Sequence, residues 1–162
     1  MAELNPRQRR SRKNKPAQGL RARALRLLAR REYSRHELER KLALYTENPD
    51  EIPELLDDFE RRGWLSERRV VAQVLASRRR RFGARRIAYE LHQKGVSESA
   101  VVGAQQQLRA SELDAARAVW ARKFGTLPRD TRERARQVRF MQSRGFALET
   151  VLLIIKHGAD DD

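Results

Sequence analysis

The sequence predicts an all-α protein, an elongated array of three tandem three-helix repeats with about nine helices. Three observations support this fold class. Apolar residues recur at intervals of three and four, no segment alternates apolar and polar residues over more than a few positions, and one glycine-centred pattern occurs three times. The 162 residues include 36% charged side chains and only ten aromatic ones, which is little material for one thick core. We therefore expect several thin helical layers.

The first repeat is expected over residues 20–65. Apolar spacing from Leu20 onward marks its first helix, and the second helix begins at a capping box formed by Ser34 and Glu37. The apolar face of this second helix is expected to consist of Leu38, Leu42 and Tyr45.

The third helix of this repeat is predicted from about Pro53 to Arg62, because proline fits the start of a helix and not its interior. Gly63 follows, at a position where a left-handed residue ends a helix. The segment 47–60 contains seven acidic residues and no basic one. This part of the chain is therefore strongly acidic within a basic protein.

The second repeat is expected over residues 66–110, with Ser66 as the cap of its first helix. Gly83 interrupts the helical pattern, Gly95 ends the next helix and Ser97 caps the one after it. Apolar residues at helical spacing mark the three helices: Val70, Val71, Val74 and Leu75 in the first, Ile87 and Leu91 in the second, and Val101, Val102 and Leu108 in the third.

The third repeat is expected over residues 111–158, followed by an acidic end at 159–162. Ser111 restarts the helical pattern, and two breaks divide the rest, one at Gly125 with Pro128 and one at Gly145. The resulting helices are predicted near 112–124, 130–144 and 147–157.

The breaks share one pattern, which reads apolar, two polar residues, a base, glycine, apolar. It occurs around three glycines: Gly63, Gly95 and Gly145. A glycine after a helix adopts the left-handed conformation, and the apolar residue behind it contacts the last turn. Tyr33 and Phe82 precede helix starts at equivalent places in the first two repeats. We interpret both as packing residues under a helix entry and keep base stacking as the alternative.

The charge is +14 and is unevenly distributed. Residues 1–23 hold eight basic side chains and one acidic one, and residues 1–19 show no periodicity, so a disordered basic tail is predicted at 1–19. Half of the net charge remains beyond residue 23. Clustered Lys and Arg favour a partner with phosphates or an acidic protein surface. The alternative is a well-solvated helical surface.

The strongest local binding signal is a cluster of arginines in the second repeat, within a segment from 68 to 86 that holds eight Arg and no acid. Arginine suits the forked recognition of carboxylates and phosphates. Four consecutive helical residues cannot all face one partner, so only some of the run should make contacts. The candidate partner-binding residues are Arg78, Arg79, Arg80, Arg81, Arg85 and Arg86.

Catalytic and metal-binding patterns are not found, so we predict no enzyme activity, no cofactor and no metal site. The chain has no cysteine, no glycine-rich phosphate loop and no nucleophile elbow. Adjacent carboxylates at Asp57 and Asp58, and at 160–162, diverge on a helix and are interpreted as solvated charge. Three histidines lie on separate predicted helices and are expected to be surface or packing residues: His36, His92 and His157.

The longest strongly apolar run is Val151–Ile155, far short of the roughly 20 residues that span a bilayer. No apolar signal segment follows Met1. The expectation is therefore a soluble, cytoplasmic monomer without a membrane partner.

Four segments together resemble the RecX family, bacterial regulators of the RecA recombinase. The resemblance covers about residues 20–157, and the order and spacing of the segments make it specific. The segments are REYSRHELERKL (31–42), RRGWLSERRV (61–70), RFGARRIAYELHQKGVS (81–97) and RFMQSRGFALETV (139–151).

The resemblance implies a curved, modular protein of three three-helix repeats that binds in the helical groove of the RecA filament on single-stranded DNA. There it would restrain filament growth, ATP hydrolysis and strand exchange. It also implies contacts from the basic face of the middle and C-terminal repeats, which corresponds here to the segment Arg78–Arg86. Two alternatives stay open: a stand-alone basic nucleic-acid-binding protein without a RecA partner, and a module that regulates another ATPase.

Overall fold

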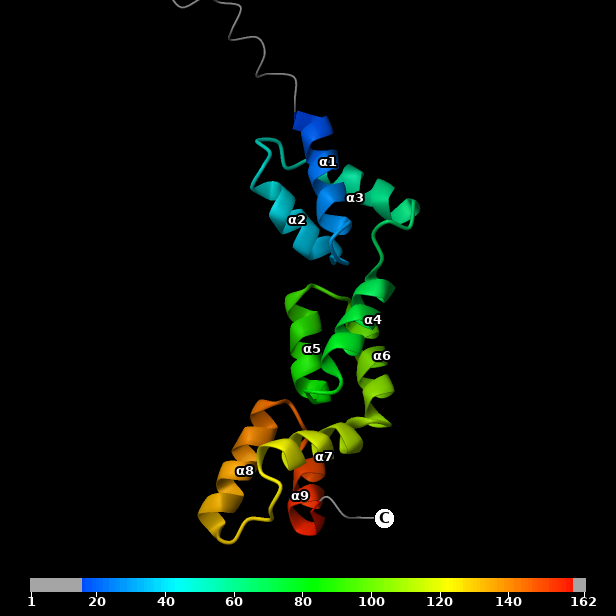
Figure 1. Cartoon of the computed structure of the whole chain (residues 1–162). Helices are drawn as coiled ribbons and strands as arrows, with labels where there is room; N and C mark the ends of the chain where they lie inside the picture. Colours follow the sequence, from blue (N-terminus) through cyan, green and yellow to red (C-terminus); the bar gives the residue numbers. More distant parts are fainter. Residues whose placement is uncertain (1–15, 159–162) are drawn as a thin grey trace, which may run out of the picture. The chain divides into compact units, whose positions relative to one another are not determined.

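The computed structural model describes residues 16–158, which fold into nine helices without a strand (Figure 1). The all-α class is therefore confirmed for this part of the chain. The tail predicted at 1–19 lies outside the described residues up to position 15, as does the acidic end at 159–162. Residues 16–19, which the prediction assigned to this tail, form the start of the first helix instead. The helices are α1 (Pro16–Leu28), α2 (Arg35–Ala43), α3 (Glu51–Arg61), α4 (Glu67–Arg78), α5 (Ala84–Gln93), α6 (Glu98–Arg109), α7 (Glu112–Lys123), α8 (Thr131–Ser143) and α9 (Leu148–His157).

The chain divides into two compact units, with the boundary between Ser66 and Glu67. The first unit contains α1–α3 and the second contains α4–α9. Each helix triplet nevertheless has its own cluster of buried apolar residues. Because no cluster draws on a second triplet, the prediction of three tandem three-helix repeats is confirmed.

In the first repeat the predicted capping box is present. The Glu37 N–H donates to Ser34 Oγ over 3.0 Å, and the Ser34 N–H donates to Glu37 Oε2 over 2.9 Å. The prediction that Tyr45 is on the buried face is wrong, because α2 ends at Ala43 and Tyr45 is 57% exposed. The buried core consists of Leu20, Ala24, Tyr33, Leu38, Leu42, Ile52, Leu56, Phe59 and Leu65.

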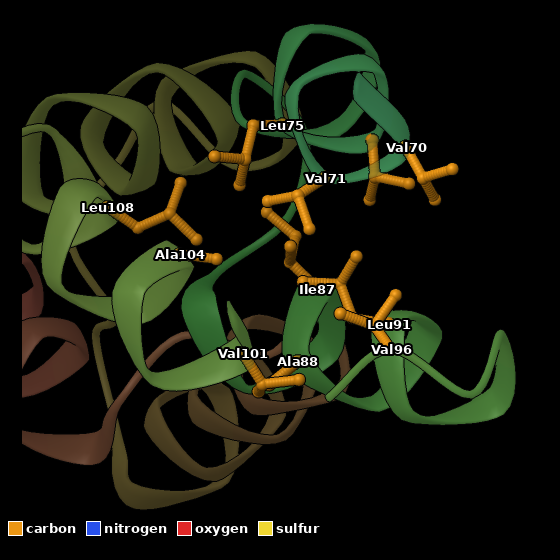
Figure 2. Packing of buried hydrophobic residues seen from close by; sticks show 11 residues of the cluster. Val70, Val71, Leu75, Ile87, Ala88, Leu91, Val96, Val101, Ala104 and Leu108 are labelled. Atoms are coloured by element: carbon orange, nitrogen blue, oxygen red, sulfur yellow. The ribbon is translucent and has the colours of Figure 1, made fainter. Parts of the chain in front are cut away.

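The second repeat packs α4, α5 and α6 around one cluster, whose side chains converge in Figure 2. Val102 is not part of it, although the sequence placed it there. It is 41% exposed, because the buried stripe of α6 consists of Val101, Ala104 and Leu108 and Val102 lies outside this stripe. The buried members are Val70, Val71, Val74, Leu75, Ile87, Ala88, Leu91, Val96, Val101, Ala104 and Leu108.

The third repeat contains a buried polar pair at the side of its core. Trp120 Nε1 donates to Gln137 Oε1 over 2.8 Å, and Gln137 Nε2 donates to the Thr126 carbonyl over 3.1 Å. These bonds satisfy polar groups that would otherwise be buried without partners. The surrounding core consists of Ala116, Trp120, Met141, Phe146, Val151, Ile154 and Ile155.

The helix ends follow the predicted breaks, with one difference at the serine caps. The three glycines of the shared pattern have the expected positive φ: Gly63 (70°), Gly95 (71°) and Gly145 (87°). Ser97 and Ser111 stand at N-cap positions, but neither side chain accepts a capping hydrogen bond. Instead, the N–H and the hydroxyl of Ser97 both donate to the Glu67 carboxylate, which joins the starts of α6 and α4.

Candidate functional site

The second and third repeats meet through two turns whose backbones lie against each other. Gly83 precedes α5, and Gly145 lies between α8 and α9. The Gly83 N–H donates to the Arg144 carbonyl over 2.9 Å, and the Arg85 N–H donates to the Gly145 carbonyl over 3.2 Å. These bonds satisfy N–H groups at the start of α5 that have no partner within the helix.

Glycine is required on both sides of this junction. A Cβ atom at Gly83 would overlap the carbonyl of Gly145, and a Cβ atom at Gly145 would overlap Arg86. The φ of Gly83 is −80°, so the need at that position is steric and not conformational. The sequence predicted a helix break at Gly83 but gave no sign of this close approach.

Two side-chain bonds extend the junction to the start of α7. The Ala84 N–H donates to Glu112 Oε1 over 3.1 Å, and Arg79 Nη2 donates to Ser111 Oγ over 3.0 Å. Backbone and side-chain bonds thus tie the turn between α4 and α5 to the third repeat at two places. The surface around this junction therefore has side chains from both repeats in defined positions.

A basic hollow of about 320 Å³ opens beside the junction, and we call it the first hollow. Five of the side chains that line it are cationic, three are apolar and none is a carboxylate. The cationic residues are Arg80, Arg81, Arg122, Lys123 and Arg144, and the apolar ones are Ala118, Val119 and Phe140. The α4–α5 turn, α7 and α8 each contribute to this lining.

Within residues 16–158, no ion pair neutralises any of the five cations. Aromatic rings hold two of them in place. The guanidinium of Arg144 lies 5.3 Å from the centre of the Phe82 ring and 5.2 Å from that of Phe140. Lys123 Nζ also lies 5.2 Å from the centre of Phe140. Such cation–π contacts restrict a side chain without cancelling its charge.

A second hollow, of about 530 Å³, lies between α5 and the end of α8. It is more mixed in chemistry than the first, since it includes one carboxylate and several amide and hydroxyl groups. Tyr89 is 65% exposed there, beside Arg85 and Arg86. The lining residues are Arg85, Arg86, Tyr89, Glu90, Gln93, Gln142, Ser143 and Gly145.

The structure separates the six predicted arginines into distinct environments. Arg78 is neutralised, because its Nε donates to Glu90 Oε2 over 3.0 Å. The helix α4 ends at this residue, so the expectation that the whole run is helical is wrong and the next three lie in a turn. Arg79 bonds Ser111. The remaining four are divided between the hollows: Arg80 and Arg81 in the first, Arg85 and Arg86 in the second.

Sequence reasoning missed four residues of this surface: Tyr89, Arg122, Lys123 and Arg144. A signal existed for Arg144, which is the base before glycine in the repeated pattern. For the pair in the last turn of α7, nothing in the local sequence indicated that it faces Arg80 and Arg81.

In the first unit several arginines are paired with carboxylates of α3, whereas three others line a separate hollow of about 300 Å³ and have no ion pair among the described residues: Arg23, Arg26 and Arg30. Asp58 accepts hydrogen bonds from Arg21 over 3.0 Å and from Arg62 over 2.9 Å. Arg35 contacts Asp57 and Glu60. The interpretation of Asp57 and Asp58 as merely solvated charge is therefore wrong, since both are in ion pairs. The hydrogen bond from Arg21, together with that from Arg62, holds the pKa of Asp58 below its ordinary value.

This lowered pKa predicts acid sensitivity in the first repeat. A carboxyl group whose folded-state pKa is depressed stabilises the fold above its unfolded pKa of about 3.9, and that stability is lost as pH falls through the folded value. We therefore expect the urea midpoint of the Asp58→Asn variant to fall less than that of the wild-type protein when the pH is lowered from 5 to 2. These values lie within the interval of roughly pH 1–5 over which such carboxyl groups titrate.

The matched control is Glu54→Gln, which alters an exposed carboxylate on the same helix outside the ion-pair cluster. Urea titrations followed by circular dichroism at several pH values measure the effect. If Asp58→Asn and the wild-type protein lose stability in parallel, the ion pairs of Asp58 do not contribute to acid sensitivity.

The histidines and carboxylates of the described residues form no metal-binding group of three or more. All three histidines are exposed, and His92 Nδ1 lies 3.7 Å from Glu98 Oε2. No helix in the described range has both the length and the apolar character needed to cross a membrane. Tyr33 is buried in the first core, which agrees with the packing role predicted for it.

Comparison with known proteins gives the same result for all three repeats. The family descriptions "RecX, first three-helix domain", "RecX, second three-helix domain" and "RecX, third three-helix domain" match residues 21–59, 66–103 and 110–155, respectively. Together these matches cover most of the described chain.

Relatives that match over most of the chain belong to the same family as the three domain matches. The chain is 47% identical over 152 residues to the regulatory protein RecX of Leptothrix cholodnii. The aligned residues cover 92% of this chain and 97% of that protein. It is 48% identical over 141 residues to the regulatory protein RecX of Ralstonia nicotianae, with coverage of 87% and 88%. The crystal structure of RecX from Lactobacillus salivarius has the same fold, with a TM-score of 0.74, 15% identity and coverage of 87% and 95%. The three domain matches and these identities show that the chain belongs to the RecX family of regulatory proteins.

Proposed function

We propose that this protein is a non-catalytic inhibitor of RecA. It binds in the groove of the RecA filament on single-stranded DNA through the basic surface of its second and third repeats. There it restrains filament extension, ATP hydrolysis and strand exchange. Membership of the RecX family supports a regulatory role.

The observation that carries the proposal is the first hollow with its five unneutralised cations. A protein surface seldom concentrates like charges without counter-charges unless a partner supplies them, because like charges repel. By contrast, Arg21, Arg35 and Arg62 of the first repeat are paired with carboxylates of α3. The filament offers both phosphates and acidic side chains, either of which suits arginine.

The test measures single-strand-dependent ATP hydrolysis by RecA from the same source, with increasing amounts of this protein. Inhibition is expected well below one molecule per RecA protomer, because a protein that blocks a filament end or occupies a continuous groove affects many subunits. A requirement for one molecule per protomer would indicate sequestration of free RecA instead. Absence of any effect, even at low salt, would exclude the RecA role.

A second candidate function is nucleic-acid binding without RecA. The exposed Tyr89 beside Arg85 and Arg86 favours it, because an aromatic ring next to cations can stack a base while the arginines contact phosphates. Binding of a single-stranded oligonucleotide without RecA, combined with unchanged RecA activity, would select this alternative.

A further inference from the structure

We propose that the first hollow is a binding site for closely spaced phosphate groups. This chemistry is shared by the phosphate chain of a free nucleotide and by successive phosphates of a nucleic-acid strand. The proposal deepens the proposed function, because it names the ligand chemistry of the same hollow, and its test omits RecA so that it can fail separately from the RecA role. It assigns a ligand to residues of both the second and the third repeat.

The first argument is hydrogen-bonding chemistry. Arginine and lysine side chains only donate hydrogen bonds, and alanine, valine and phenylalanine side chains neither donate nor accept them. The side chains that line the first hollow are all of these types, so they present donors and no acceptor. A peptide would bring backbone N–H groups that find no acceptor among these side chains, which costs free energy. Phosphate oxygens at neutral pH act mainly as acceptors and therefore match this lining.

The second argument is charge density. Five cations line a volume of about 320 Å³, and none has an ion-pair partner within the described residues. A single carboxylate would neutralise only one of them. Adjacent phosphates carry several negative charges within a short distance and present many oxygens to the arginine forks. The volume also lies within the range of roughly 300–1,000 Å³ that is typical of small-ligand sites.

The third argument is that part of the site is organised before a ligand binds. Arg144 is held between Phe82 and Phe140, and the junction at Gly145 fixes the backbone next to it. Less side-chain freedom is then lost on binding, which favours affinity. The apolar walls formed by Val119 and Phe140 reduce local screening by water, so each contact to a phosphate is strengthened.

The second hollow lacks this pattern and provides an internal contrast. It contains Glu90, whose carboxylate already pairs with Arg78, and it contains amide and hydroxyl groups that accept as well as donate. Phosphate binding by the protein should therefore depend on residues of the first hollow and much less on those of the second.

The test is calorimetric titration of the full chain with inorganic tripolyphosphate, without RecA. The double variant Arg122→Ala/Lys123→Ala should weaken binding at least about tenfold, as expected for the loss of charge-assisted bonds. The charge-matched control is Arg109→Ala/Arg139→Ala, which removes two exposed basic side chains of the same unit that line neither hollow. This control should change the affinity for tripolyphosphate less than about twofold, because its two side chains do not line the hollow. Both double variants remove two positive charges, so the long-range electrostatic attraction falls equally in both.

A second variant, Arg122→Gln/Lys123→Gln, repeats the measurement if the alanine variant fails to fold. Competition then identifies the source of the phosphates. Displacement of tripolyphosphate by a single-stranded oligonucleotide indicates that a strand occupies the hollow, and a lack of displacement indicates a free phosphate compound. The proposal is overturned if the two double variants lose affinity equally, or if no saturable binding occurs at low salt.

Discussion

Replacement of Gly145 by alanine should loosen the contact between the second and third repeats and lower the free energy of unfolding by about 3 kcal/mol. Two terms add to this value. A residue with Cβ at a φ of 87° costs roughly 1–2 kcal/mol, and overlap with Arg86 adds about 1–3 kcal/mol. Chemical denaturation followed by the fluorescence of buried Trp120 measures the loss. Amide hydrogen exchange at Gly83 and Arg85 should accelerate, because these N–H groups donate across the junction.

Two control variants separate the two terms. Gly63 has a similar φ of 70° but open space where a Cβ would be, so Gly63→Ala should cost only the conformational term. Gly83 has an ordinary φ of −80° but no space, so Gly83→Ala should show mainly the overlap. If Gly145→Ala costs no more than Gly63→Ala and amide protection at Gly83 is retained, the close packing is not what holds these repeats together.

The second large effect concerns RecA inhibition. Changing Arg80, Arg81, Arg85 and Arg86 together to alanine should raise the concentration for half-maximal inhibition by roughly 100-fold. Each contact to a carboxylate or phosphate loses a charge-assisted pair, and an average of about 0.7 kcal/mol for each partly exposed side chain gives this factor. The helices should survive, since alanine is the best helix former. Arg78 is left unchanged, because its removal would leave Glu90 without its ion-pair partner.

Truncation of residues 1–15 is the comparison variant. It removes six bases and one acid, a somewhat larger loss of positive charge than the four-arginine change, and it stops before α1 begins at Pro16. It should weaken inhibition much less than the four-arginine change. Its main effect should be on the salt-sensitive binding of nucleic acid. For single strands, the logarithm of the affinity falls with the logarithm of the salt concentration by about 0.7 for each neutralised phosphate.

Both variants are measured for oligonucleotide binding alone and for RecA inhibition. Loss of inhibition on truncation, with normal inhibition by the four-arginine variant, would mean that the protein acts by competing for DNA. Nucleic-acid binding without a RecA contact would then be the better account of its function.

Much of the fold could be predicted because its signals are local. The capping box of Ser34 and Glu37 and the left-handed glycines at Gly63 and Gly95 involve atoms within a few residues of each other. The apolar periodicity of α4 and α5 likewise predicted their buried faces. The error at Tyr45 arose because α2 ends early, at Ala43, and the error at Val102 arose because this residue lies outside the buried stripe of α6.

The sequence by itself therefore determined the nine helices found within residues 16–158, the places where they break, the repeat and the position of the arginine run. Only the tertiary structure decided which arginines are free: Arg78 finds a carboxylate one helix away, whereas Arg80 and Arg81 meet further cations from the third repeat. It also decided that Gly83 and Gly145 must both lack a Cβ. The physical reason is range. Caps and periodicity depend on neighbours along the chain, but ion pairing, backbone contact and the shape of a hollow depend on groups that only folding brings together.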